Sequence, residues 1–68
     1  MELIGANQPR RVRIGLNDVG TFCIIEQWPP FTYRGPFPTR IAAEWHALLR
    51  AEAEWYAVEI EHVEGKIT

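Results

Sequence analysis

Four prolines within ten residues divide this 68-residue chain into two parts. They lie in residues 29–38, whose sequence is PPFTYRGPFP. Proline has no backbone N–H and a nearly fixed φ angle, so neither a helix nor a central strand can run through this segment. The chain before the segment and the chain after it must therefore each form their own regular structure.

The part before the prolines predicts a β-hairpin. Residues 11–16 alternate between polar and apolar side chains, which is typical of a half-buried strand. Residues 21–28 are rich in β-branched and aromatic side chains, as strands are, and the Asn, Asp and Gly of residues 17–20 favour a turn between the two. Near the start of the chain, Leu3 and Ile4 suggest a short additional edge strand.

The part after the prolines predicts a helix and then a strand. Thr39 can cap the helix, and residues 40–54 are rich in the strong helix formers Ala, Leu, Glu and Arg. From residue 55 the apolar period changes to two, which predicts a third strand that ends near residue 64. Large apolar residues recur on the helix at three- and four-residue spacing and form one stripe, which we expect to face the core: Ile41, Trp45, Leu48 and Leu49.

We therefore expect an α+β fold in a single domain over residues 1–68, with the element order β-β-α-β. One helix packs on one face of a three-stranded sheet, because the sheet and the helix each have one apolar side to bury. The expected strand order is 2-1-3, with the last strand antiparallel to the first. The expected core contains Val12, Ile14, Leu16, Phe22, Ile24, Ile41, Trp45, Leu48, Val58 and Ile60.

Composition narrows the class of protein. Hydrophobic residues make up 47% of the chain and charged residues 24%, which is typical of a globular domain. No apolar run approaches the roughly 20 residues that a membrane helix requires. Residues 1–7 lack the features of a signal peptide, and a single cysteine cannot form an internal disulfide. We expect a cytoplasmic protein without membrane association.

The residues that usually carry chemistry are scarce. The chain has no serine, and Cys23 lies between two large apolar residues in a predicted strand, where cysteine usually acts as a small buried hydrophobe. His46 and His62 each have one near acidic neighbour, Glu44 and Glu64, and only the pair of His62 and Glu64 lies on one strand face where it could chelate, whereas metal sites usually need three or four ligands. No glycine-rich loop precedes the helix. We therefore expect no catalytic residue, no metal and no cofactor.

The charges are unevenly placed along the chain. Residues 1–40 hold five arginines against three acidic residues, whereas residues 41–68 hold two basic residues against six glutamates. Arg10, Arg11 and Arg13 could hold the phosphates of a nucleic acid. The alternative, which we favour, is that Arg11 and Arg13 pair across the sheet with glutamates of the last strand, Glu59 and Glu61.

The proline-rich segment also gathers aromatic rings at residues 28, 31, 33 and 37. We expect two rings to fold over the sheet and one or two to be exposed, with Tyr33 and Phe37 exposed beside a turn tip at Arg34 and Gly35. Rigid aromatic residues supply much of the binding energy at protein interfaces. The partner-binding residues predicted from the sequence are Phe31, Tyr33, Arg34 and Phe37.

These observations favour a non-enzymatic protein-binding module, such as a small inhibitor or adaptor that covers a partner protein. Small acidic chains without motifs are common in phages and other mobile elements, where many inhibit a host protein, anti-CRISPR proteins among them. Another copy of the chain is one form of partner, as a homodimer. Two alternatives stay open: a nucleic-acid-binding module that uses the arginine strand, and an oligomeric enzyme with a site between subunits.

Overall fold

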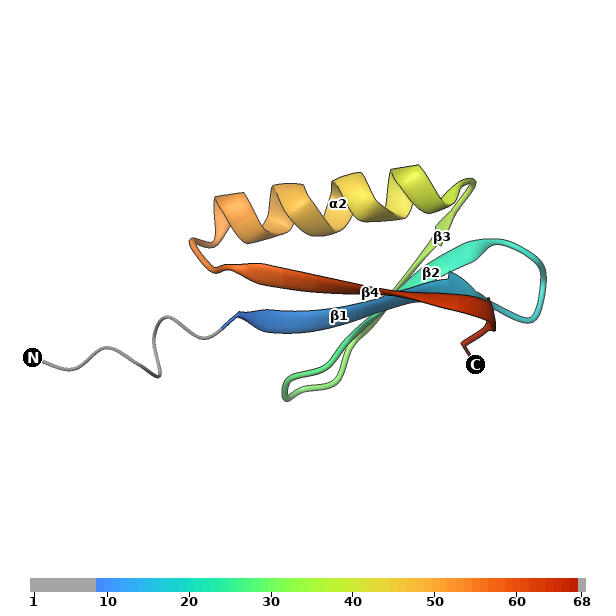
Figure 1. The fold of residues 1–68 in the computed structure, drawn as a ribbon, viewed down its shortest axis with the longest axis horizontal. Coiled ribbons are helices and arrows are strands. Elements are labelled where there is room, and N and C mark those ends of the chain that lie inside the picture. Colours follow the sequence, from blue (N-terminus) through green and yellow to red (C-terminus); the bar gives the residue numbers. More distant parts are fainter. Residues whose placement is uncertain (1–8, 68) are drawn as a thin grey trace, which may run out of the picture.

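The fold is a four-stranded mixed sheet with one helix on one face, as the computed structural model of residues 9–67 shows (Figure 1). The strands lie in the order β3-β2-β1-β4. The α+β class is confirmed, whereas the expected three-stranded sheet is wrong, and the strand expected at Leu3 and Ile4 lies outside the described residues. The elements are β1 (Arg10–Leu16), β2 (Phe22–Glu26), β3 (Tyr33–Phe37), α2 (Arg40–Ala53) and β4 (Val58–Lys66).

β1 and β2 form the predicted antiparallel hairpin. Asn17 organises its turn, because the side-chain Oδ1 accepts hydrogen bonds from the backbone N–H groups of Val19 and Thr21, at 3.0 and 3.1 Å. Such side-chain-to-backbone bonds are the reason asparagine favours turns. Gly20 follows with φ at 84°, a left-handed conformation that glycine adopts without steric cost.

The strand that the sequence prediction omits, β3, forms inside the proline-rich segment. It pairs antiparallel with β2, with Tyr33 opposite Ile25 and Phe37 opposite Phe22. β3 lies at the edge of the sheet, where one side of a strand needs no N–H donors, so Pro36 is tolerated there. Proline thus excludes a central strand from this segment, as expected, but permits an edge strand.

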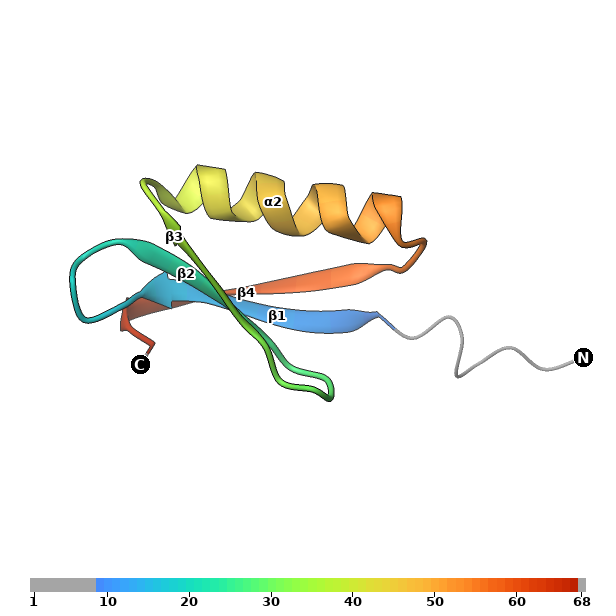
Figure 2. The ribbon, with the colours of Figure 1, turned by 180° about the vertical axis from the view of Figure 1, so that it is seen from behind.

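The extra strand also reverses the expected direction of β4. Each hairpin turns the chain around, so β3 runs in the same direction as β1, α2 returns, and β4 runs parallel to β1 (Figure 2). The expected antiparallel pairing of these two strands is therefore wrong. The prediction lacked β3 and therefore counted one chain reversal too few. The expected position of the first and last strands side by side is confirmed.

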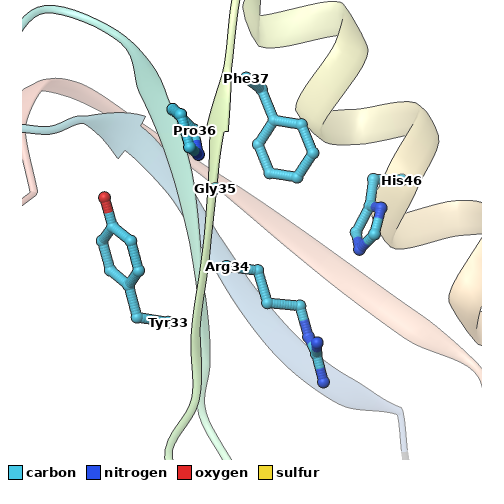
Figure 3. Close-up of a pocket in the computed structure, with 6 residues that line it drawn as sticks. All are labelled: Tyr33, Arg34, Gly35, Pro36, Phe37 and His46. Atoms are coloured by element: carbon cyan, nitrogen blue, oxygen red, sulfur yellow. The ribbon is translucent and has the colours of Figure 1, made fainter.

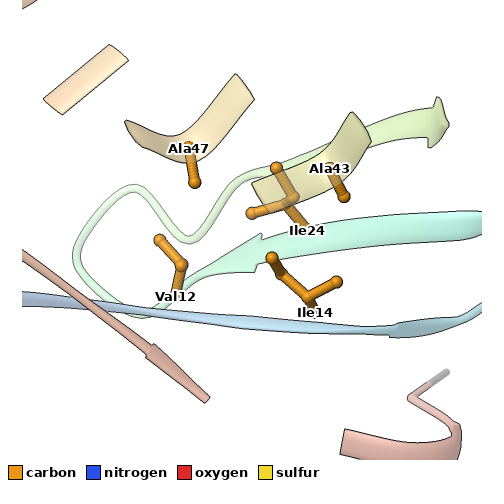
Figure 4. Close-up of a cluster of buried hydrophobic side chains, with 5 residues drawn as sticks. All are labelled: Val12, Ile14, Ile24, Ala43 and Ala47. Atoms are coloured by element: carbon orange, nitrogen blue, oxygen red, sulfur yellow. The ribbon is translucent and has the colours of Figure 1, made fainter. Parts of the chain in front are cut away.

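α2 begins as predicted, since the Thr39 hydroxyl accepts a hydrogen bond from the Ala42 N–H at 3.0 Å. Its alanines Ala43 and Ala47 pack on the sheet (Figure 4). None of the helices in residues 9–67 is both long enough and apolar enough to cross a membrane. On the sheet side of the expected core, Val12, Ile14 and Ile24 are buried, and Phe22, Val58 and Ile60 are partly buried against them. Leu16, which was also expected in the core, is only partly buried and lies outside this cluster.

The helix side of the expected core is wrong. Ile41, Trp45 and Leu48 are 66%, 59% and 43% exposed, respectively. The small alanines occupy the space above the sheet because large sheet residues, including Phe22 and Phe37, already fill its borders. α2 therefore packs through its small residues and turns its large ones outward. We call the face of the sheet under α2 the inner face and the opposite one the open face.

Candidate functional site

The four aromatic rings of residues 28–37, in and next to the proline-rich segment, divide into two pairs. Trp28 and Phe37 are partly buried against the core, whereas Phe31 and Tyr33 are 69% and 50% exposed. This agrees with the expectation of two rings over the sheet and one or two exposed, but Phe37 is on the partly buried side and the expectation that it is exposed is wrong. The segment therefore offers two exposed rings, at and beside the turn between β2 and β3, and the Tyr33 hydroxyl accepts a hydrogen bond from Nδ2 of Asn17 at 3.2 Å.

Arg34 is occupied by the fold. It lies within β3 and not at a turn tip, and its Nε donates to Oε2 of Glu26 at 2.8 Å. Glu26 is only 4% exposed, and its Oε2 also lies 3.4 Å from Nε of Arg50 on α2. Arg50 in turn pairs with Glu54 at 3.1 Å. These four residues neutralise one another, so the cluster holds no surplus charge for a ligand.

A shallow hollow of about 390 Å³ lies beside this cluster, between β3 and α2. Figure 3 shows Arg34, Phe37 and His46 on one side of β3 and Tyr33 on the other. The His46 ring lies 5.1 Å from the Phe37 ring. Burial above all, and then the charges of Arg50 and Arg34, lower the pKa of His46 below its usual value, which favours the neutral imidazole. This hollow is polar packing around a histidine, and none of the described residues that line it is a serine, threonine or cysteine.

The arginines of β1 are also paired within the fold. On the open face, Arg11 donates to Glu59 at 2.9 Å and Arg13 lies 3.4 Å from Glu61, which confirms the predicted cross-strand ion pairs. Arg10 places its guanidinium over two aromatic rings, 5.2 Å from that of Trp28 and 4.6 Å from that of Tyr56 (both to the ring centroid).

The residues with metal-binding or nucleophilic chemistry are dispersed. No group of three His, Cys, Asp or Glu side chains in residues 9–67 could hold a metal ion. Cys23 is fully buried, as predicted, and burial raises the pKa of its thiol above the usual value, although a hydrogen bond with Tyr33 opposes the shift. A buried protonated thiol is a poor nucleophile.

The most unusual surface lies on α2. Its large apolar residues share one side, away from the sheet, and we call this side the outer helix face. Burying an aliphatic side chain completely contributes about 1.5–3 kcal/mol of free energy. A row of exposed apolar side chains therefore leaves this free energy unused in the isolated chain. The face consists of Ile41 (66% exposed), Trp45 (59%), Leu48 (43%) and Leu49 (56%).

Trp55 extends this apolar surface beyond the end of the helix. It is 93% exposed and has φ at 61°, an uncommon conformation for a residue other than glycine. With Ala51, Glu52 and Tyr56 it lines a hollow of about 420 Å³ at the C-terminal end of α2. With about 250 Å² for a fully exposed indole, Trp45 and Trp55 alone present roughly 150 and 230 Å². Apolar patches larger than a few hundred Å² mark interaction sites on soluble proteins.

Sequence reasoning missed this surface because α2 carries two apolar stripes. The large residues form one stripe and the alanines, at positions 43, 47 and 51, form the other at a spacing of four. A helix that is apolar on two sides can bury only one of them against a single sheet, and here the stripe of large residues stays exposed. The regular alanine spacing was the signal in the sequence that could have revealed the second stripe.

Comparison of this chain with protein-family models, curated proteins and solved structures finds no match.

Proposed function

We propose that this protein is a non-enzymatic protein-binding module that docks on its partner through the outer helix face. One observation carries the proposal: four large apolar side chains stand exposed on one side of α2 while its alanines face the sheet. Placing such residues outward has no benefit for the isolated fold, whereas buried Trp and aliphatic anchors supply the energy of protein interfaces. The ligand that this surface suits best is a protein, either a target that an inhibitor or adaptor covers or a second copy of this chain.

The geometry favours this face over the proline-rich segment. Of the residues predicted there from the sequence, Arg34 is paired with a buried glutamate and Phe37 packs on the core. Phe31 and Tyr33 remain as exposed rings near one end of the sheet, and in this proposal they lie outside the interface.

The nucleic-acid alternative has less support. Arg11 and Arg13 are each matched by a glutamate on β4, and Arg10 is stacked on aromatic rings. Affinity for nucleic acid depends mainly on positive charge that is free to neutralise phosphates. Because the arginines of β1 are paired with glutamates of β4, this strand offers little free positive charge.

The test uses two matched substitutions on exposed aromatic residues, Trp45→Glu on the outer helix face and Phe31→Glu in the β2–β3 turn. Wild-type chain and both variants are used as bait in a lysate of the cells that make this protein. A photoreactive residue is also placed at position 49, on the outer helix face, or at position 59, on the open face.

The expected result is one protein that binds the wild type and Phe31→Glu, is lost with Trp45→Glu, and crosslinks from position 49 but not from position 59. Binding that survives Trp45→Glu and disappears with Phe31→Glu would overturn the proposal and assign the interface to the proline-rich segment. Circular dichroism of each variant verifies that the fold is retained.

A further inference from the structure

We infer that the occupant of the outer helix face is a second copy of this chain, paired through two antiparallel α2 helices about a two-fold axis. The inference rests on the proposed function, since it takes the same face as the binding surface and names what binds there. Two-fold dimers of this isologous kind are the commonest assemblies of soluble proteins.

The charges at the ends of α2 provide the first argument. The N-terminal end of a helix is electrically positive and the C-terminal end negative, so acidic residues stabilise the start and basic residues the end. α2 departs from this arrangement: it begins with Arg40 and has no acidic residue in its first turn, whereas Glu52 and Glu54 stand at its end. Arg50, the basic residue of the last turn, pairs with Glu26 and Glu54, so Glu52 is the acidic residue at this end that Arg50 does not neutralise.

An antiparallel second helix compensates both ends at once. It brings the acidic end of each copy beside the positive, uncompensated first turn of the other. A parallel pair would instead place Glu52 beside Glu52 of the second copy. Glu44, which borders the face, lies 3.8 Å from His62 of β4, so its carboxylate is directed toward its own sheet.

The spacing of the apolar residues is consistent with a two-fold axis. Trp45 and Leu48 stand in the middle of the outer helix face, and Ile41 and Glu52 lie at equal distances along the chain on either side of them. With the axis between Trp45 and Leu48, each indole packs on Leu48 of the second copy, and each Glu52 lies next to Ile41 of the second copy.

The area is sufficient for a stable contact. With about 250 Å² for a fully exposed indole and about 100 Å² for an aliphatic side chain, the outer helix face and Trp55 together present roughly 550 Å² of apolar surface. A standard interface buries about 800 Å² per partner, with an apolar centre and a polar rim. The charged residues that border the helix supply the rim.

The first experiment measures the mass of the intact chain by sedimentation equilibrium over a wide concentration range. The wild type should be a dimer, and Leu48→Glu should raise the dissociation constant at least tenfold while circular dichroism stays unchanged. Val19→Glu is the matched control, because Val19 is also an exposed aliphatic residue, 80% exposed, but lies in the β1–β2 turn. A dimer that Leu48→Glu leaves intact would overturn the inference.

The second experiment tests the direction of the helices by cysteine crosslinking. Positions 41 and 52 are about 16 Å apart along a helix, and a disulfide requires Cα atoms within about 7 Å. Mixed Ile41→Cys and Glu52→Cys chains should therefore form a disulfide with each other, whereas either variant alone should not. Cys23 is fully buried and does not compete. A disulfide formed by Ile41→Cys alone would overturn the antiparallel pairing.

The two proposals fail in different ways. A wild-type chain that is monomeric at every concentration overturns the dimer, while the proposed function still stands if Trp45→Glu abolishes binding of another protein. If the face binds neither a second copy nor another protein, both are wrong.

Discussion

The orientation of α2 can be tested by a pair of substitutions with opposite expectations. Trp45→Ala removes a large residue from the outer helix face, and Ala47→Leu adds one to the side that packs on the sheet. Trp45 is 59% exposed, so about 100 Å² of its ~250 Å² is covered. At ~25 cal/mol/Å² the covered area sets a ceiling of about 2.5 kcal/mol on the loss of unfolding free energy.

The expected loss for Trp45→Ala is smaller, about 1 kcal/mol or less. Alanine has the higher helix propensity, which offsets part of the loss. Ala47 is only 4% exposed and sits in the core cluster with Val12 and Ile24, so Ala47→Leu should lose about 1–3 kcal/mol through overpacking.

Urea unfolding followed by circular dichroism measures both changes, in a Leu48→Glu background so that self-association does not contribute to stability. A buried tryptophan replaced by alanine loses about 3–5 kcal/mol. A loss of that size for Trp45→Ala, together with a neutral Ala47→Leu, would refute the orientation and place the large residues in the core.

Further changes test the charged and buried groups. Glu26→Gln should lower the unfolding free energy by about 2–3 kcal/mol in urea titrations, because two partly exposed arginines lose their common carboxylate. Cys23 should react with thiol reagents only after unfolding, as a colorimetric thiol assay would detect, and rapid labelling of the native protein would contradict its burial. Arg13→Glu should destabilise by about 0.2–1 kcal/mol through repulsion from Glu61, and retention of full stability would contradict the ion pair. The lowered pKa of His46 means that the unfolded chain binds a proton more readily, so stability should fall as the pH drops below about 6.5, and His46→Phe should reduce this fall in thermal scans.

The elements that the sequence predicted correctly are those set by local chemistry. The alternation of residues 11–16, the asparagine at the turn and the threonine at the helix cap each specify their structure through neighbouring atoms. The ion pairs of Arg11 and Arg13 were also predictable, because pairing needs only that the first and last strands be neighbours. Their relative direction does not change which residues face the open side.

β3 could not be predicted in the same way. The proline rule describes what a backbone cannot do in the middle of a sheet, and an edge strand escapes it because half of its hydrogen-bonding groups need no partner. Whether such a segment becomes an edge strand depends on the neighbour available, here β2, which offers pairing to Tyr33 and Phe37. The direction of β4 then followed from that one missed reversal.

The orientation of α2 was decided by size and not by hydrophobicity. A helix usually buries one apolar side, and either stripe of α2 could be that side. The stripe of larger residues is the more hydrophobic one, so it is the one expected to be buried. In the structure the alanines are buried instead. Phe22, Trp28 and Phe37 fill the space around Val12 and Ile14, so only small helical side chains fit above these two residues. Because the alanines of α2 complete the core, the large residues on the other side of the helix are not buried in it. Natural sequences usually break such local rules where function requires it, so the mistaken prediction of the core and the candidate interface have the same physical origin.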